Sequence, residues 1–421
     1  MIGTTRNARL VAAAVALCTL STTAAGCAPE VARPAVTHIA ADVSARAPRT
    51  AQLSALARQL IAAGAPGVIV RVDDGNGRVI EIADQAPWSA ADHVLSAGDE
   101  FRMGSSTKTM VAALVLQLVA QHRIGLDDPI AKWLPGMVPD GNAITVRMLL
   151  NHTSGLFNDI NDPGVLKAFT GQDTTVLTPQ LLLEAAFTHP ALFAPGSSYS
   201  YSNTNYIALG LLLEKATGQS LTSLIHDRIA VPLDLTDTYL ASYTPDPSNM
   251  KLADGYEPDA KILAGVLPPG TPAGSAFAGP AERQWVNTTW INDSTEWAAG
   301  GVVSTAADWA KFQTALVSDK LFPAAQLAEM ETTVSEGPST ANRYGLGFEQ
   351  TATPCGTVWG HVGQVPGYSS ENYTDPSGRR TVAVFVTTIF GLAQPRTGTA
   401  NQNLINAAVC AMLDKGVPAA H

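Results

Sequence analysis

The chain of 421 residues is 46% hydrophobic and 15% charged, which is enough apolar material for one large core or two joined cores and argues against wholesale disorder. Its formal net charge of −10 comes from 36 acidic and 26 basic side chains, and the basic residues form no run. Because a nucleic-acid backbone is bound by clustered Lys and Arg, this composition excludes nucleic acid as an expected partner.

The N-terminus predicts an export signal over residues 1–26. Two arginines precede an apolar stretch from Leu10 to Leu20, and small residues follow up to Gly26. As a helix the apolar stretch would span about 16 Å, which is about half of a membrane's hydrocarbon core. It therefore predicts a cleaved signal and not a permanent membrane span.

The sequence TTAAGC at the end of this segment resembles the lipobox of bacterial lipoproteins, in which the cysteine, here Cys27, becomes the lipidated first residue. Ala24 stands where leucine is usual, so ordinary cleavage and secretion is the alternative. Lipidation is favoured because it leaves the mature chain with an even pair, Cys355 and Cys410, in an oxidising compartment. We expect export, a lipid anchor on the outer face of the cell membrane, and a Cys355–Cys410 disulfide.

The segment after the signal predicts a linker and then the first ordered elements. Residues 27–50 are rich in Ala and Pro without a sustained period, which predicts a flexible tether. Residues 51–64 have apolar positions at helical spacing and end in a glycine. Two β-rich runs within residues 67–84 flank the turn sequence DGNG, which predicts a hairpin.

The rest of the chain predicts an α/β fold of the α+β type. Residues 126–284 hold mostly helical pieces joined by Pro- and Gly-rich loops, whereas strand patterns return between 356 and 390, with a turn at 375–378, and a final helix runs from 402 to about 414. We expect an antiparallel β-sheet flanked by helices, built from 51–125 and 285–421, with 126–284 inserted as an all-α domain.

The motif Ser-x-x-Lys occurs at Ser105–Lys108 and at Ser248–Lys251. The second copy lies in a proline-broken loop, but the first stands at the start of a long apolar helix. There the i to i+3 spacing brings the lysine ammonium over the serine hydroxyl, and the helix N-terminus supplies unpaired N–H donors. On this stretch alone, a Ser/Thr helix cap followed by a solvated lysine explains the pattern equally well.

Two further motifs are unique in the chain. Tyr201-Ser202-Asn203 precedes another apolar helix, and His361-Val362-Gly363 lies on a predicted strand. The bland alternatives are a capping loop for the first and a structural histidine beside a glycine turn for the second. In the functional interpretation, Tyr201 accepts a proton, the Asn203 amide binds a substrate carbonyl, and the glycine lets a substrate backbone approach the strand.

The order of the three motifs resembles the penicillin-recognising serine hydrolases, which comprise serine β-lactamases, D-alanyl-D-alanine carboxypeptidases and related esterases. The stretches FRMGSSTKTM, ITVRMLLNHTSGL, FAPGSSYSYSNTNYIALG and AAGGVVSTAADWAKF carry the same resemblance, over about residues 50–415. It implies a β-lactamase/transpeptidase-like fold and an envelope hydrolase whose substrate is a small molecule or a peptidoglycan peptide, with β-lactams as further ligands.

The resemblance also implies a role for each motif residue. Ser105 would attack the carbonyl and form an acyl-enzyme, with Lys108 and Tyr201 sharing the general-base role. The backbone N–H groups of Ser105 and Gln364 would form the oxyanion hole, with Asn203, His361 and Gly363 beside the substrate. Such a mechanism needs no metal and no cofactor.

One departure leaves the substrate open. The carboxypeptidase pattern His-Thr-Gly-Thr reads His361-Val362-Gly363-Gln364 here, and the neighbouring strand offers Glu349 where a basic residue would suit a substrate carboxylate. An esterase or broad amidase on the same serine is therefore an alternative to a carboxypeptidase or β-lactamase. A non-catalytic penicillin-binding envelope protein is a third, and the oligomeric state stays open.

Overall fold

The computed structural model describes residues 37–241, 248–266 and 275–416. Backbone contacts divide the chain into residues 1–46 and residues 47–421, and every described strand lies in the second unit. The longer helices are α1 (Thr37–Ala62, shared between the two units), α2 (Thr107–Ala120), α5 (Pro179–Phe187), α6 (Asn203–Thr217), α10 (Ala306–Leu316) and α12 (Pro395–Met412). The shorter ones are α3 (Val146–Leu150), α4 (Pro163–Phe169), α7 (Leu221–Ile225), α8 (Ala260–Leu263), α9 (Trp297–Gly300) and α11 (Ala324–Met330).

An antiparallel sheet of eight strands organises the second unit, in the order β2-β1-β14-β13-β12-β11-β10-β9. Its strands are β1 (Gly67–Asp73), β2 (Val79–Gln85), β9 (Val334–Ser335), β10 (Arg343–Tyr344), β11 (Glu349–Thr353), β12 (Gly356–Val365), β13 (Tyr368–Thr374) and β14 (Thr381–Val386). The N-terminal hairpin joins the C-terminal strands because β1 pairs with β14 from Val68↔Val386 to Asp73↔Thr381. The two ends of the chain thus build one sheet, as the sequence predicts.

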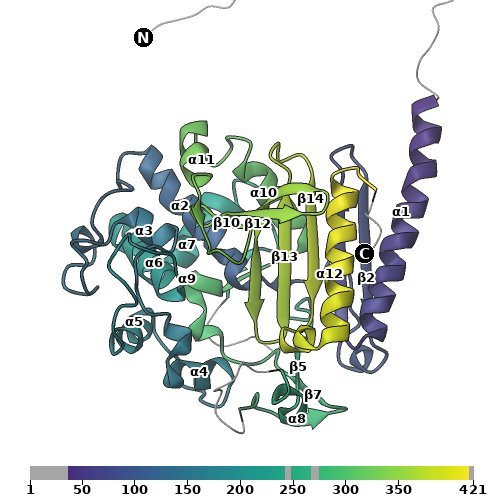
Figure 1. The fold of residues 1–421 in the computed structure, drawn as a ribbon, viewed down its shortest axis with the longest axis horizontal. Helices are drawn as coiled ribbons and strands as arrows, with labels where there is room; N and C mark the ends of the chain where they lie inside the picture. The colour runs from purple at the N-terminus through teal and green to yellow at the C-terminus, as the bar shows by residue number, and fades with distance from the viewer. Residues whose placement is uncertain (1–36, 242–247, 267–274, 417–421) are drawn as a thin grey trace, which may run out of the picture. The chain divides into compact units, whose positions relative to one another are not determined.

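Both faces of the central strands are buried. Along β14, Val382 and Val384 pack into a core with α12 and the part of α1 after residue 47, while Phe385 packs into the core of the opposite face. The helix α10 covers that opposite face, and Figure 1 shows α12, in yellow, lying along the sheet. Strands buried on both faces explain the continuous apolar run in this part of the sequence.

The helix α2 is the centre of the larger core. All its residues from Thr107 to Leu116 are buried, so it presents no solvated face. It packs against α6 and α7 from the region 126–284, and against α9 and β12 from the segment that follows it. A helix enclosed in this way holds the residues of its first turn rigidly, which a solvent-exposed cap would not.

Two predictions about organisation need correction. The predicted tether overlaps α1, which begins at Thr37, because the alanine-rich stretch is helix-forming and continues through Pro48. The insert 126–284 is also not all-α, since β4 (Tyr239–Leu240), β5 (Tyr256–Pro258) and β6 (Ala281–Glu282) lie within it. β5 and β6 pair with β7 (Trp285–Asn287), and β4 pairs with β8 (Val302–Ser304), which also pairs with β3 (Phe101–Arg102). The strands within the insert are too short to leave a periodic pattern in the sequence.

The disulfide Cys355–Cys410 is present, with 5.3 Å between its Cα atoms. It joins the turn before β12 to α12, so it ties the strand that carries His361 to the C-terminal helix. The signal segment and Cys27 lie outside the described residues. Within the described residues, no helix has the length and apolar character needed to cross a membrane.

Candidate active site

Ser105 and Lys108 are brought together at the start of α2. Ser105 lies in the single turn Gly104–Ser106 that leads into the helix, and Lys108 Nζ donates a hydrogen bond of 2.9 Å to Ser105 Oγ. The i to i+3 prediction for this pair is confirmed. The second Ser-x-x-Lys copy is different, because Lys251 is exposed and bound to Asp237.

The Lys108 ammonium is buried and surrounded by neutral acceptors. Besides Ser105, Nζ donates to Asn203 Oδ1 at 2.8 Å and to the Ala299 carbonyl at 2.7 Å, and it lies 4.9 Å from the centroid of the Tyr201 ring. Burial lowers the pKa of Lys108 to about 7, although nearby carboxylates oppose this. A lysine with this pKa carries a neutral amine on a large fraction of molecules at neutral pH.

Tyr201 and Asn203 flank the same amine from the start of α6. The Tyr201 hydroxyl is buried and makes no hydrogen bond of standard geometry with any described residue. Burial raises the pKa of Tyr201 well above 10, and the nearby Ser105 hydroxyl only partly counters this. Asn203 is held through its backbone N–H, which donates to Asn158 Oδ1 at 2.9 Å, and no described residue accepts from its side-chain Nδ2. That amide group is free to donate to a ligand.

Ser106, the neighbour of the predicted nucleophile, has a structural role. Its hydroxyl donates to the His361 carbonyl at 3.2 Å and accepts a 3.1 Å hydrogen bond from Asn372 Nδ2. Ser370 Oγ lies 3.2 Å from it and donates to the Met103 carbonyl at 2.9 Å. These contacts fix the turn before α2 to β12 and β13, so the two adjacent serines divide into one that binds the sheet and one that contacts the lysine.

Two glycines allow the turn and β12 to approach closely. A Cβ at Gly363 would lie 1.8 Å from the Met103 carbonyl oxygen, and a Cβ at Gly104, whose φ is +52°, would lie 2.5 Å from the Gln364 nitrogen. No side chain fits at either position. The backbone of Gln364 is therefore adjacent to the backbone of the Ser105 turn, as the predicted oxyanion hole requires.

The His361 side chain is satisfied within the protein. Its Nδ1–H donates to the Val362 carbonyl at 2.6 Å, and Nε2 accepts from the Tyr344 hydroxyl at 2.8 Å. Burial and the nearby Lys108 lower the pKa of His361 to about 3, so the ring is neutral. Both ring nitrogens thus have protein partners, and the ring lies 6.4 Å from that of Tyr201, so a place for His361 beside the substrate stays a prediction.

Glu349 lies near the site, as the departure from the carboxypeptidase pattern indicates. Its Oε1 is 3.8 Å from His361 Nε2, and burial raises the pKa of Glu349 to about 8, with Glu336 and Glu371 adding to the rise. Among the described residues, Lys108 is the only Lys or Arg whose charge acts on the pKa of this carboxyl. With a pKa of about 8, the Glu349 carboxyl is largely protonated at neutral pH and offers no positive charge to a ligand carboxylate.

The comparisons with known proteins agree with this geometry. A family model described as Beta-lactamase matches residues 53–406. The chain belongs to the Beta-lactamase family. The fold is accordingly β-lactamase/transpeptidase-like, a mixed α/β architecture with antiparallel sheets flanked by helices.

Three similar proteins illustrate the range of this family. Esterase EstB of Burkholderia gladioli is 34% identical over 193 residues, 42% of this chain and 48% of the esterase. The putative penicillin-binding protein PbpX of Bacillus subtilis (strain 168) is 26% identical over 287 residues, 68% of this chain and 61% of that protein. A D-stereospecific amidohydrolase from Streptomyces sp. superposes with a TM-score of 0.69 at 32% identity, covering 83% of this chain and 98% of that one. The chain thus spans about half to three fifths of the two curated relatives.

Sequence reasoning missed three buried groups around Lys108. His152 accepts hydrogen bonds on Nδ1 from the Ser202 N–H and Asn205 Nδ2, and its ring lies 4.2 Å from that of Tyr201. Asp159 and Glu296 are buried carboxylates whose charges act on Lys108. His152 lies in the family-like stretch ITVRMLLNHTSGL, which was a usable signal, but nothing local marks the two acids.

Proposed function

We propose that this chain is a serine hydrolase that forms an acyl-enzyme on Ser105 and acts on an ester or amide in the cell envelope. The observation that carries the proposal is the 2.9 Å hydrogen bond between Ser105 Oγ and the buried amine of Lys108. A serine hydroxyl becomes a useful nucleophile when a base with a pKa near the working pH lies within hydrogen-bonding reach. Membership of the family supports the same chemistry.

Lys108 is the better candidate for the base. Its pKa is lowered to about 7, whereas the pKa of Tyr201 is raised well above 10. As Ser105 Oγ bonds to the substrate carbonyl carbon, its proton passes to the neutral Lys108 amine. The carbonyl π electrons move onto the oxygen, and collapse of the tetrahedral intermediate expels the leaving group, which receives a proton. The buried Tyr201 hydroxyl is suited to carry that proton from Lys108 to the leaving group. Water then releases the acyl group by the same route.

The developing oxyanion would be bound by the backbone N–H groups of Ser105 and Gln364. The close approach at Gly104 and Gly363 supports this assignment, because it sets the two backbones side by side. One donor of this kind contributes about 3–4 kcal/mol to transition-state stabilisation. The free Nδ2 of Asn203 would bind a carbonyl oxygen of the substrate.

The choice of substrate follows from the charges around the site. Glu349 and the internally satisfied His361 leave no cation to bind a terminal carboxylate among the described residues here, which favours esters and amides without one. Two of the similar proteins, an esterase and a D-stereospecific amidohydrolase, support esters and amides as the substrate class. D-alanyl-D-alanine carboxypeptidase or β-lactamase activity is the second candidate, favoured by the similarity to a putative penicillin-binding protein, and a non-catalytic penicillin-binding role is the alternative to both.

The test is covalent labelling of the purified chain with a fluorescent fluorophosphonate and a fluorescent penicillin. The wild type and Ser106→Ala should be labelled, and Ser105→Ala should not. Hydrolysis of p-nitrophenyl butyrate should exceed both release of D-alanine from a peptidoglycan pentapeptide and cleavage of nitrocefin. Binding of penicillin without any turnover would support the non-catalytic alternative and contradict the enzyme.

We further propose that the chain is exported and anchored to the outer face of the cell membrane through Cys27. Incorporation of labelled palmitate into the full-length chain, lost in Cys27→Ala, tests the anchor. Release of an unlabelled mature protein into the medium would support secretion instead.

A further inference from the structure

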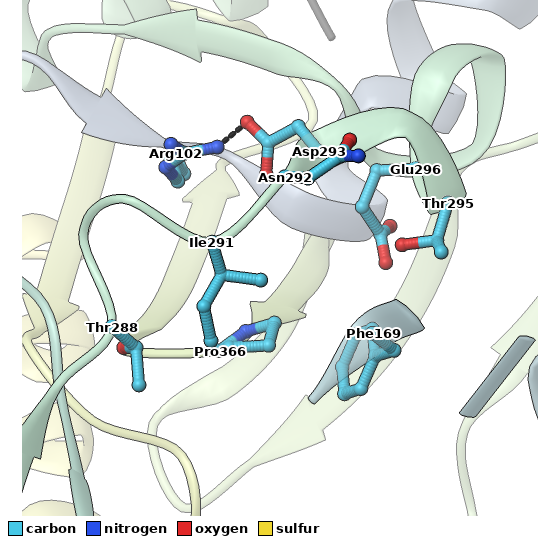
Figure 2. A pocket seen from close by; sticks show the side chains of 9 residues that line it. All are labelled: Arg102, Phe169, Thr288, Ile291, Asn292, Asp293, Thr295, Glu296 and Pro366. Carbon is cyan, nitrogen blue, oxygen red and sulfur yellow. Dashed lines mark ion pairs between the residues drawn. The ribbon is translucent and has the colours of Figure 1, made fainter. Parts of the chain in front are cut away.

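Glu296 is a buried carboxylate that the mechanism above does not use. The residue is 4% exposed, and within the described residues its side chain accepts no hydrogen bond and forms no ion pair. It lines a small pocket that also contains Arg102 and Asp293 (Figure 2). Because a buried carboxylate without a donor is costly, such a group needs a reason for being there.

Arg102 in the same pocket does not neutralise Glu296. Its guanidinium forms an ion pair with Asp293 and donates to the Thr289 carbonyl at 2.9 Å. Figure 2 shows Arg102 facing Asp293, with the Glu296 carboxylate on the far side of Asp293 from the guanidinium. The Arg102 charge lowers the pKa of the Glu296 carboxyl, but less than a second cation does.

That cation is Lys108, which Glu296 approaches through two adjacent residues of α9. A Cβ at Gly300 would lie 1.9 Å from Glu296 Oε2, so the carboxylate lies directly against the Gly300 backbone. The preceding residue, Ala299, accepts the 2.7 Å hydrogen bond from Lys108 Nζ. The carboxylate and the amine thus contact the same end of α9 without contacting each other.

Other titratable groups also face Lys108, and all of them except Tyr201 contact further polar groups. The groups are Asp159 before α4, Glu349 on β11, the imidazoles of His152 and His361, and the phenols of Tyr201 and Tyr206. Asp159 accepts from Thr204, Glu349 lies beside His361, and both imidazoles are held neutral by burial. Among the described carboxylates, Glu296 has the largest effect on the pKa of Lys108, and no described residue donates a hydrogen bond to it.

We propose that Glu296 is a positioning residue that acts through Lys108, as the separated counter-charge for the ammonium formed when Lys108 takes the Ser105 proton. In this step the proton moves from Ser105 Oγ to Lys108 Nζ, and the ammonium forms near the Glu296 carboxylate. The proton later leaves with the departing group. This inference rests on the proposed function.

The separation has a physical purpose. A carboxylate in direct contact would hold Lys108 as an ammonium and take away the lone pair that must accept the proton. A carboxylate one residue further away stabilises the product of proton transfer while leaving Nζ directed at Ser105. Burial raises the pKa of Glu296 to about 7, and the charge of Lys108 acts in the opposite direction. Two groups that influence each other in this way titrate as a pair.

The test is an NMR titration of Lys108 in the full chain with lysine labelled at Cε, assigned by Lys108→Met. In Glu296→Gln the pKa of Lys108 should fall by about one unit, because an opposite charge nearby raises a lysine pKa by that order. Glu296→Asp, which keeps the charge, should stay closer to wild type. The matched control is Glu371→Gln, which replaces a partly buried glutamate that accepts a hydrogen bond from Tyr373 and is not among the charges that shift the pKa of Lys108, and it should leave the titration unchanged.

The kinetic counterpart is the pH profile of Ser105 acylation. Its acid limb should move down by the same unit in Glu296→Gln, and the plateau rate should fall several-fold because the base is weaker. An unshifted Lys108 titration in folded Glu296→Gln would overturn the inference even if Ser105 is acylated normally. Absence of Ser105 acylation in the wild type would overturn the proposed function instead. If Glu296→Gln fails to fold, the Glu296 carboxyl is titrated by NMR in wild type labelled at glutamate. A carboxyl that stays protonated up to pH 9 would overturn the inference, because it could not act as a counter-charge.

Discussion

Replacing Lys108 with methionine should stabilise the protein at neutral pH while abolishing acylation. Burial lowers the pKa of Lys108 from 10.5 to about 7, and a shift of about 3.5 units corresponds to about 5 kcal/mol against folding at pH 7 and below. Methionine has a similar volume, but its introduction deletes three hydrogen bonds worth about 1 kcal/mol each. The expected net gain at pH 7 is about 2 kcal/mol.

The sign of this effect depends on pH. Above pH 10.5 the lysine is neutral in both the folded and the unfolded chain, so its cost vanishes, and the cost grows as pH falls from 10.5 to about 7. At pH 9 about 2 kcal/mol of the cost remains, so Lys108→Met should be neutral or destabilising by about 1 kcal/mol.

Urea unfolding of wild type and Lys108→Met at both pH values measures this, with the exposed Lys261→Met as the control expected to change little. If the unfolding free energy of Lys108→Met is lower than that of wild type by the same several kcal/mol at pH 7 and pH 9, burial does not lower the pKa of the amine and the reasoning is refuted.

Three further predictions concern the site and its support. Tyr201→Phe removes a buried hydroxyl whose nearby polar group is the Ser105 hydroxyl, so the unfolding free energy should change by no more than about 1 kcal/mol, while stopped-flow acylation slows by about 100-fold or more. A large loss of stability together with the loss of acylation would contradict this. Gly363→Ala forces a Cβ against the Met103 carbonyl and should lose about 1–3 kcal/mol of stability and most acylation, whereas Gly416→Ala, with open space around it, should match wild type in both assays. Removing both Cys355 and Cys410 should lower the unfolding free energy by about 4 kcal/mol, and dithiothreitol should lower the melting temperature of wild type but not of the variant.

The elements that could be predicted are those whose cause is local. The hairpin β1–β2 follows from the DGNG turn between alternating apolar runs, and the Lys108–Ser105 contact follows from helical spacing once a helix starts at this point. The closing turn between β13 and β14 could likewise be predicted, since the Gly378 N–H donates to the Asp375 carbonyl there.

The rest depends on contacts that sequence distance hides. Glu296 precedes α9 by one residue, and only the packing of α9 on α2 brings its charge near Lys108. The His361 ring is directed toward Tyr344 because β10 pairs with β11, and β10 has too few residues to leave a pattern in the sequence. The helical start of α1 was missed because alanine-rich sequence with a proline fits a tether as well as a helix.

The central claim, that Ser105 is the nucleophile, is tested most directly by mapping the acyl group. The chain is mixed with a p-nitrophenyl ester, quenched in acid during the burst, digested and analysed by mass spectrometry. The account predicts one acyl group per chain on Ser105, with Ser106 unmodified and no adduct in Ser105→Ala. An acyl group on another residue, or ester turnover that persists in Ser105→Ala, would contradict it.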